Sequence, residues 1–291
     1  MKPPPFEYHD PTTVEETVAS LAQHGEEAKV LAGGQSLVPL LNFRLARPEH
    51  LVDINRVKEL DYLRLDDGTL RIGALVRQSR LERSDETAAQ VPLLREALRF
   101  VGHVQIRNRG TVGGSVAHAD PAAELPAAFA ALDARFHVRS ARGERKISAA
   151  DFFVTHLTTA LEPDELLTEI EVPVPGAGTG YAFVEFARRL GDFALGGAAV
   201  LVRLAGDGRC ECAALALLGA APTPLRPAQA ESFLRGRSVD EGSAREAAAL
   251  AVAGVEPTGD IHGSTGYRRG LIETLVHRAL LLAHERAQER E

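Results

Sequence analysis

The stretches AGGQS at residues 32–36 and TVGGS at residues 111–115 decide the fold, because each combines two adjacent glycines with hydroxyl side chains. The first stretch follows an apolar run at residues 28–32 and is predicted to join a strand to a helix. At such a junction glycine lets backbone N–H groups approach an anion closely, and the helix dipole favours negative charge. One such stretch is typical of a plain turn. Two similar stretches about 80 residues apart indicate a ligand with two phosphates.

Two other nucleotide-binding patterns are absent from the sequence. There is no G-x-G-x-x-G pattern of the Rossmann fold, although Asp53 stands about 20 residues after Gly33, where that fold places an acidic residue. There is also no G-x-x-x-x-G-K-[ST] pattern of the P-loop. Asp53 is therefore predicted to end a strand rather than to bind a ribose.

The length and charge of the chain limit its class. A chain of 291 residues suits two or three domains. A net charge of −7 and a pI near 5.8 argue against a nucleic-acid-binding protein, which needs a basic face. No apolar run approaches the roughly 20 residues that span a bilayer, and the start, MKPPP, lacks the apolar core of a signal peptide. We therefore expect a cytoplasmic protein without a transmembrane segment.

Cys210 and Cys212 are the only cysteines, and both fall in an apolar run at residues 209–218 that is predicted to be a strand. Residues two apart on a strand share a face and lie too close together for an ordinary disulfide. Two thiolates are also fewer than the four that usually hold an iron–sulfur cluster. His118 and Asp120, which a strand would place on one face, have no third ligand nearby and are predicted to be structural or to border a cofactor. The sequence thus predicts no metal site and no catalytic residue in this chain.

The chain divides into a first part of mixed strands and helices and a second part of antiparallel strands followed by helices. Thr13 and Glu16 match a capping box that predicts a helix ending at Gly25, Ser36 is predicted to cap a second helix, and Asp120-Pro121 a later one. The expected strands are residues 28–32, 50–54, 62–76 (a hairpin turning at 66–68), 135–139, 166–174, 181–188, 195–204 and 210–218; further expected helices are 91–101, 227–234, 243–253 and 267–286, and the expected linker is 173–180.

Three longer stretches carry a resemblance to a known family. They are VLAGGQSL (30–37) followed by RPEHLVDI (47–54), IRNRGTVGGS (106–115) with DPAAELP (120–126), and FARR (186–189) leading into GDFAL (191–195). Together, in the same order and over essentially the whole chain, they resemble the FAD-binding (medium) subunit of the molybdenum hydroxylases. That family includes carbon monoxide dehydrogenases, aldehyde oxidoreductases, nicotine and caffeine dehydrogenases and xanthine dehydrogenase.

The resemblance implies an α+β fold in two domains. Residues 1–175 would form an FAD-binding domain of the vanillyl-alcohol-oxidase (p-cresol methylhydroxylase) type, with subdomains at about 1–55 and 56–175. Residues 176–291 would form a C-terminal α+β domain with a small antiparallel sheet and helices.

The resemblance also implies which residues contact FAD. The two glycine stretches would wrap the pyrophosphate, Glu124 would accept hydrogen bonds from the cofactor, and Phe193 would cover the flavin ring. Val101 and Leu167 would line the cofactor, and the lysine contact of xanthine dehydrogenase, at Val184 here, would be absent or replaced by Glu185. The full implied set is Leu31, Ala32, Gly33, Gly34, Gln35, Ser36, Leu37, Val101, Thr111, Gly113, Gly114, Ser115, Glu124, Leu167 and Phe193.

The function implied is electron relay by noncovalent FAD. Molybdopterin on a large partner subunit would oxidise the substrate, and two-iron two-sulfur clusters on a small partner subunit would pass electrons to FAD and on to an external acceptor, in a dimer of heterotrimers. Two alternatives stay open: a self-sufficient flavin reductase of the same fold, and a non-enzymatic FAD-binding assembly module. The substrate (carbon monoxide, an aldehyde, a purine or an N-heterocycle) also stays open, although Gln35 differs from the histidine of some carbon monoxide dehydrogenases.

Overall fold

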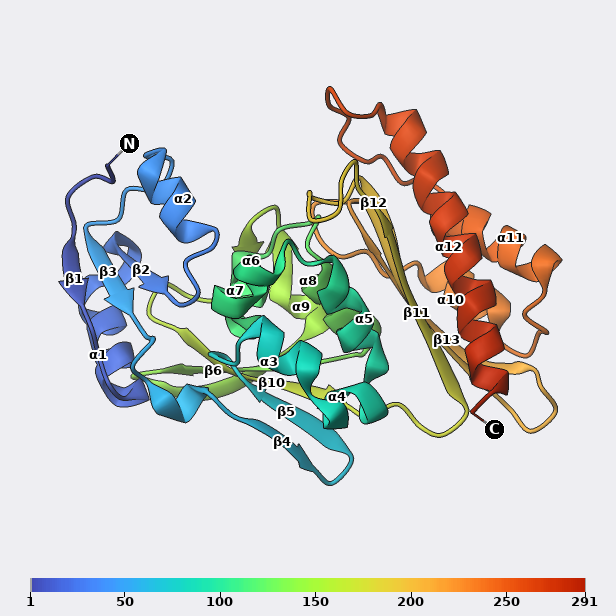
Figure 1. The fold of residues 1–291 in the computed structure, drawn as a ribbon, viewed down its shortest axis with the longest axis horizontal. Coiled ribbons are helices and arrows are strands. Elements are labelled where there is room, and N and C mark those ends of the chain that lie inside the picture. The colour runs from blue at the N-terminus through green and yellow to red at the C-terminus, as the bar shows by residue number, and fades with distance from the viewer. Residues whose placement is uncertain (1, 291) are drawn as a thin grey trace.

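The computed structural model describes residues 2–290. Three parts follow one another along its long axis: a small sheet near the N-terminus, a larger sheet covered by helices, and a C-terminal sheet backed by a long helix (Figure 1). Within residues 2–290, no helix is both long and apolar enough to cross a bilayer.

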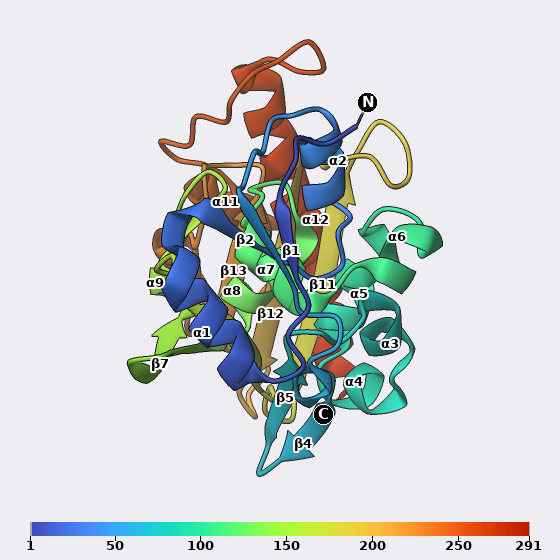
Figure 2. The same ribbon diagram turned by 90° about the vertical axis from the view of Figure 1, so that its left-hand side faces the viewer.

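The N-terminal part is a parallel sheet in the order β1-β3-β2, with α1 lying across one face (Figures 1 and 2). The apolar side of α1, with Val14 and Leu21, packs against the sheet, and Thr13 accepts a hydrogen bond from the backbone N–H of Glu16 at 3.1 Å, as predicted for its start. The elements are β1 (Glu7–His9), α1 (Val14–His24), the 3₁₀ turn η1 (Gly25–Glu27), β2 (Ala28–Leu31), α2 (Leu37–Asn42) and β3 (His50–Asp53). The predicted β-α-β unit is therefore confirmed, with β1 added at its edge.

The middle part is an antiparallel sheet in the order β4-β5-β10-β6-β7, covered by six short helices (Figure 1). Its strands are β4 (Leu63–Asp66), β5 (Thr69–Gly73), β6 (Arg135–Ser140), β7 (Gly143–Ser148) and β10 (Leu166–Pro173), preceded by the 3₁₀ turn η2 (Lys58–Leu60). The covering helices are α3 (Gln78–Arg83), α4 (Asp85–Gln90), α5 (Pro92–Phe100), α6 (Val104–Arg109), α7 (Val112–His118) and α8 (Glu124–Ala131); α9 (Ala149–Phe152), β8 (Phe153–Thr155) and β9 (Thr158–Thr159) follow β7.

The C-terminal part is an antiparallel sheet in the order β11-β12-β13 with a helical layer on one face (Figure 1). The elements are β11 (Thr179–Phe186), β12 (Gly196–Leu204), β13 (Cys210–Leu218), α10 (Ala228–Leu234), α11 (Glu241–Ala251) and α12 (Thr265–Gln288). Apolar residues of the other face, such as Phe183 and Leu218, join the apolar cluster of the middle part. The predicted strands, helices and turn at Gly208 (φ +76°) of this region are confirmed, and both cysteines are free.

Three local predictions are wrong. Asp120 does not cap a helix: its carboxylate accepts a hydrogen bond from the N–H of Ala122 at 2.8 Å, and α8 begins only at Glu124. His118 ends helix α7, so no strand aligns it with Asp120. Ser36 precedes α2, but its side chain makes no capping hydrogen bond.

Candidate FAD site

The two glycine stretches lie against each other, although they are far apart in the sequence. A Cβ atom added to Gly33 would lie 2.7 Å from the carbonyl oxygen of Arg109 and 2.8 Å from the Cα of Gly110. A Cβ added to Gly114 would lie 3.7 Å from the Cβ of Ala32. The structure therefore brings the first four residues after β2 together with the start of α7, which is what a shared pyrophosphate site requires.

A pair of polar side chains that sequence reasoning missed holds the two stretches together. The Nδ2 of Asn55 donates to the carbonyl of Ala32 at 2.7 Å, and an Arg77 Nη atom donates to the Oδ1 of Asn55 at 2.7 Å. The other Nη of Arg77 donates to the carbonyl of Arg109. Burial, and then the charge of Arg109, lower the pKa of Arg77. We call Asn55 and Arg77 the clamp; no local pattern marks them, because their partners lie at distant positions.

The two stretches differ in what their backbone N–H groups can do. In the second stretch these groups already have partners: Gly113 donates to the carbonyl of Ala74 at 3.0 Å, and Gly114 donates to the Oγ1 of Thr111 at 3.1 Å. A Cβ on Gly113 would also lie only 2.6 Å from that of Ala74. Gly113 thus serves close packing, and the side-chain hydroxyls of this stretch are those of Thr111, which is buried, and of Ser115, which is half-buried.

In the first stretch, by contrast, the backbone N–H groups of residues 33–36 donate no hydrogen bond to any acceptor in residues 2–290. Gly34 has a φ of +74°, a conformation that favours glycine, and the Gln35 side chain donates to the carbonyl of Gly33 at 3.1 Å. Successive unpaired N–H groups beside the first turn of a helix suit an anion. The two stretches therefore differ in hydrogen bonding: the first presents N–H groups that could receive an anion, and the N–H groups of Gly113 and Gly114 in the second are already paired.

Two buried carboxyls lie on the elements that follow. Glu124, the first residue of α8, is 9% exposed, and burial raises its pKa to about 7. On β11, burial and then the charge of Glu124 raise the pKa of Glu185 to about 8. Within the described residues, Glu185 Oε2 is buried without a hydrogen-bond partner. A buried polar oxygen without a partner is costly, and the N–H and hydroxyl donors of FAD suit this one.

The apolar residues of the implied set occupy different surroundings. Val101 follows α5 and is buried, whereas Phe193 is 73% exposed in the turn before β12. That turn lies over the residues after Val101, because a Cβ on Gly191 would lie 2.6 Å from the ring of His103. The structure thus places Val101 and Phe193 near the same turn, whereas Leu167 is 4% exposed within the apolar cluster around β10.

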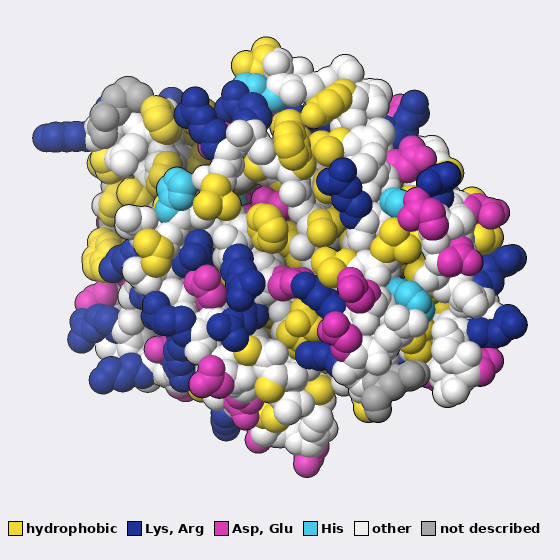
Figure 3. Space-filling model, turned by 45° about the vertical axis from the view of Figure 1, so that its right-hand side comes forward, with side chains coloured by type: hydrophobic (Ala, Val, Ile, Leu, Met, Phe, Trp, Pro, Cys, Tyr) yellow, Lys and Arg dark blue, Asp and Glu magenta, His cyan; other side chains and the backbone are white. Residues whose placement is uncertain are grey.

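Exposed apolar side chains also gather on one face of the molecule. In Figure 3 they run down the middle of the face, between flanks where Lys and Arg lie among Asp and Glu. Besides Phe193, the exposed large apolar residues of the chain include Leu190, Phe186 and Phe43.

Arg107 is not free to bind phosphate, because its Nε donates to the carboxylate of Glu82 at 2.8 Å.

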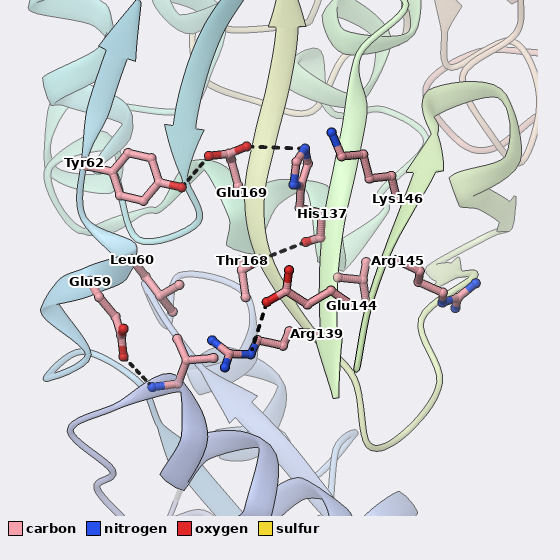
Figure 4. Close-up of a pocket in the computed structure, with 12 residues that line it drawn as sticks. Glu59, Leu60, Tyr62, His137, Arg139, Glu144, Arg145, Lys146, Thr168 and Glu169 are labelled. Carbon is pink, nitrogen blue, oxygen red and sulfur yellow. Dashed lines mark hydrogen bonds and ion pairs between the residues drawn. The ribbon is translucent and has the colours of Figure 1, made fainter. Parts of the chain in front are cut away.

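A separate hollow lies away from the two glycine stretches. It measures about 460 Å³ between α1 and the five-stranded sheet, and residues of the two glycine stretches are not among those that line it (Figure 4). Its polar groups are largely paired with one another: Tyr62 donates to Glu169 at 2.5 Å, and Arg139 contacts Glu144 at 3.4 Å. This hollow is therefore distinct from the candidate FAD site at the two glycine stretches, where the unpaired N–H groups and the clamp lie.

Family models match both parts of the chain. The model described as "FAD binding domain in molybdopterin dehydrogenase" matches residues 4–175, and that described as "CO dehydrogenase flavoprotein C-terminal domain" matches residues 181–283. The 6-hydroxypseudooxynicotine dehydrogenase complex subunit alpha of Paenarthrobacter nicotinovorans is 46% identical over 288 residues, which cover 99% of this chain and 97% of that relative.

Solved structures agree. Carbon monoxide dehydrogenase from Hydrogenophaga pseudoflava contains a chain that matches with a TM-score of 0.96 at 42% identity, covering 98% of this chain and 99% of that one. Quinoline 2-oxidoreductase from Pseudomonas putida 86 matches with a TM-score of 0.94 at 41% identity, covering 99% of both chains. The fold and the site define an FAD-binding chain with a C-terminal flavoprotein domain, as the sequence predicted. The chain belongs to the molybdenum hydroxylase family, as its medium, FAD-binding subunit.

Proposed function

We propose that this chain holds FAD between the two glycine stretches and relays electrons within a complex that also contains a large molybdopterin subunit and a small iron–sulfur subunit. The observation that carries the proposal is the contact of Gly33 with Arg109, locked by the clamp, beside a row of unpaired N–H groups. When bound, FAD supplies the redox chemistry, taking electrons from the partner's clusters and passing them to an external acceptor.

The residues of this chain bind and orient the cofactor. The N–H groups of residues 33–36 bind the pyrophosphate, with help from the hydroxyls of Thr111 and Ser115. Glu124 and Glu185, whose pKa values burial raises to about 7 and about 8, face the polar groups of the flavin or its ribityl chain. Leu31, Gln35, Leu37, Val101, Leu167 and Phe193 complete the proposed site, with Phe193 closing over the ring.

The proposed domains are residues 1–175, with subdomains at about 1–55 and 56–175, and residues 176–291. The short connection between β10, which ends at Pro173, and β11, which begins at Thr179, supports this division. We further propose a cytoplasmic dimer of heterotrimers. The chain offers FAD contacts, but its two cysteines are too few thiolates for an iron–sulfur cluster of its own, so a partner subunit would supply the cluster.

Substrate choice lies outside this chain in our proposal. The relatives named for 6-hydroxypseudooxynicotine, for carbon monoxide and for quinoline are 46%, 41% and 41% identical to it, so similar medium chains serve enzymes with different substrates. Recognition of the substrate therefore belongs to the partner that carries molybdopterin.

The test is purification of the chain alone and together with its candidate partners. We expect about one FAD per chain in both preparations, and reduction of the flavin by substrate only in the complex. Flavin reduction by NADPH in the isolated chain would instead support the self-sufficient reductase, and FAD that binds but is not reduced in the complex would support the FAD-binding assembly module. Failure to take up FAD would contradict the proposed site.

A further inference from the structure

Three histidines from three different elements meet beside the N-terminal sheet. His9 ends β1, His24 ends α1, and His50 begins β3; all three are half-buried. One ring nitrogen of each lies within 4.8 Å of those of the other two. His50 is paired with Ala28 at the beginning of β2, whereas Gly33 follows the other end of that strand, so this cluster is separate from the glycine stretches.

Two polar neighbours lie close to the same ring nitrogen of His50. The Nδ1 of His50 lies 3.1 Å from the Nε2 of His9 and 3.5 Å from a carboxylate oxygen of Glu7. A ring nitrogen either carries one proton or offers one lone pair. If Nδ1 is protonated, it can donate a good hydrogen bond to only one of these two neighbours. If it is unprotonated, its lone pair faces the Glu7 carboxylate. A cation between the three groups would satisfy all of them.

The distances suit a tetrahedral transition-metal ion. Zinc binds imidazole nitrogen at about 2.0–2.1 Å, so neighbouring ligand atoms lie about 3.3 Å apart and the ring centroids about 5 Å apart. The two contacts of His50 Nδ1 bracket the first value, and the centroid of His9 lies 5.3 Å from that of His50 and 4.9 Å from that of His24. The rings of His24 and His50 are stacked at 3.6 Å, so binding requires His24 to tilt away from His50.

We propose that His9, His24 and His50 form a structural site for a divalent transition ion of the zinc class, and that the carboxylate of Glu7 moves in as the fourth ligand. That carboxylate lies 3.5 Å from His50 Nδ1 on a side chain that is 75% exposed, so it is free to rotate toward the ion. Imidazole and carboxylate are both ligands that zinc accepts. The ion would tie β1, an edge strand of three residues, to the end of α1 and the start of β3. Its role is to anchor the chain's first strand, independently of FAD.

The test uses tag-free, full-length protein that has been stripped of metal with a chelator. Titration with Zn²⁺, followed by calorimetry, should give one ion per chain and a higher melting temperature, because the ion binds only the folded state. Co²⁺ in its place should give the visible absorption of tetrahedral cobalt. His24→Gln and His50→Gln should each weaken binding at least about tenfold, whereas His156→Gln, on an exposed turn, should leave it unchanged.

Circular dichroism and FAD content show whether each variant is folded, since neither should depend on the metal. Absence of saturable binding at one ion per chain would overturn the proposal. So would full binding by the folded double variant His24→Gln/His50→Gln, or an equal loss in His156→Gln, because either result places the ion elsewhere.

Discussion

Gly33 and Arg109 touch through their backbones: a Cβ at Gly33 would lie 2.7 Å from the Arg109 carbonyl oxygen, and the same carbonyl accepts a hydrogen bond from Arg77. The missing side chain at Gly33 and the guanidinium of Arg77 therefore set the distance between the two glycine stretches. Because that distance defines the proposed pyrophosphate site, small changes at Gly33 or Arg77 should affect FAD binding before they affect the fold.

Gly33→Ala should separate the two stretches. The added methyl group would meet three backbone atoms at 3.0 Å or less, and backbone cannot move aside as the end of a flexible side chain can. We expect a loss of stability of roughly 1–3 kcal/mol and FAD content well below one per chain. The control is Gly270→Ala in α12, where the methyl group meets nothing within 4 Å and should be neutral or stabilise by up to about 1 kcal/mol. Full flavin content in Gly33→Ala would contradict the proposed site.

Arg77→Lys should weaken FAD binding while the chain stays folded. A lysine cannot span both Asn55 and the Arg109 carbonyl, and each charge-assisted hydrogen bond that is lost is worth roughly 1.5–3 kcal/mol. Arg80→Lys, in the helix α3 that follows Arg77, is the matched control, because its ion pair with Asp61 is exposed and worth at most about 1 kcal/mol. The dissociation constant for FAD, measured by flavin fluorescence, should rise in the first variant only. Equal dissociation constants for FAD in the two variants would show that the clamp does not support FAD binding.

Glu185→Gln should stabilise the FAD-free chain increasingly as the pH rises from 5 to 8. Burial raises the pKa of Glu185 to about 8 in the folded state, so the unfolded chain releases its proton first and wild-type stability falls over this range. Glutamine stays neutral and escapes this loss, which is on the order of 4 kcal/mol at pH 8. Urea unfolding of both proteins at the two pH values measures the difference. A difference that does not grow with pH would show that Glu185 ionises normally.

The long elements were predictable from the sequence because their apolar periodicity extends over many residues. The strand and helix runs of the C-terminal part and the β-α-β unit around Gly33 are examples. The helices α3, α4, α6 and α7 were not predicted, since each spans only six or seven residues, too few for a helical period to show. The start of α8 was misplaced because Asp120 makes a local turn that mimics a helix cap.

The site was predictable only in part, for a physical reason. Glycine stretches carry a local pattern, so Gly33 and Gly114 could be singled out, but their unequal hydrogen bonding depends on Ala74 and Val76, which approach from another strand end. The clamp and the histidine cluster have no local pattern at all. Their members come from separate elements, and only the folded chain brings them together.

Glu96 should be a main tie between the helical layer of the middle part and the C-terminal part. Its carboxylate, on α5, accepts hydrogen bonds from the N–H of Phe183 on β11 at 3.0 Å and forms an ion pair with Arg286 on α12 at 2.7 Å. Glu96→Ala leaves the N–H of Phe183 without an acceptor and removes the ion-pair partner of Arg286, which keeps only its hydrogen bond to the Tyr181 carbonyl, and should cost about 2–4 kcal/mol. Glu96→Gln keeps an acceptor for one of them and should cost less. The exposed Glu246→Ala on α11 is the control, and should change the free energy of unfolding by less than about 0.5 kcal/mol. If urea unfolding ranks Glu96→Ala with the control, the tie between these parts is apolar packing alone, as in the shared cluster around Phe183.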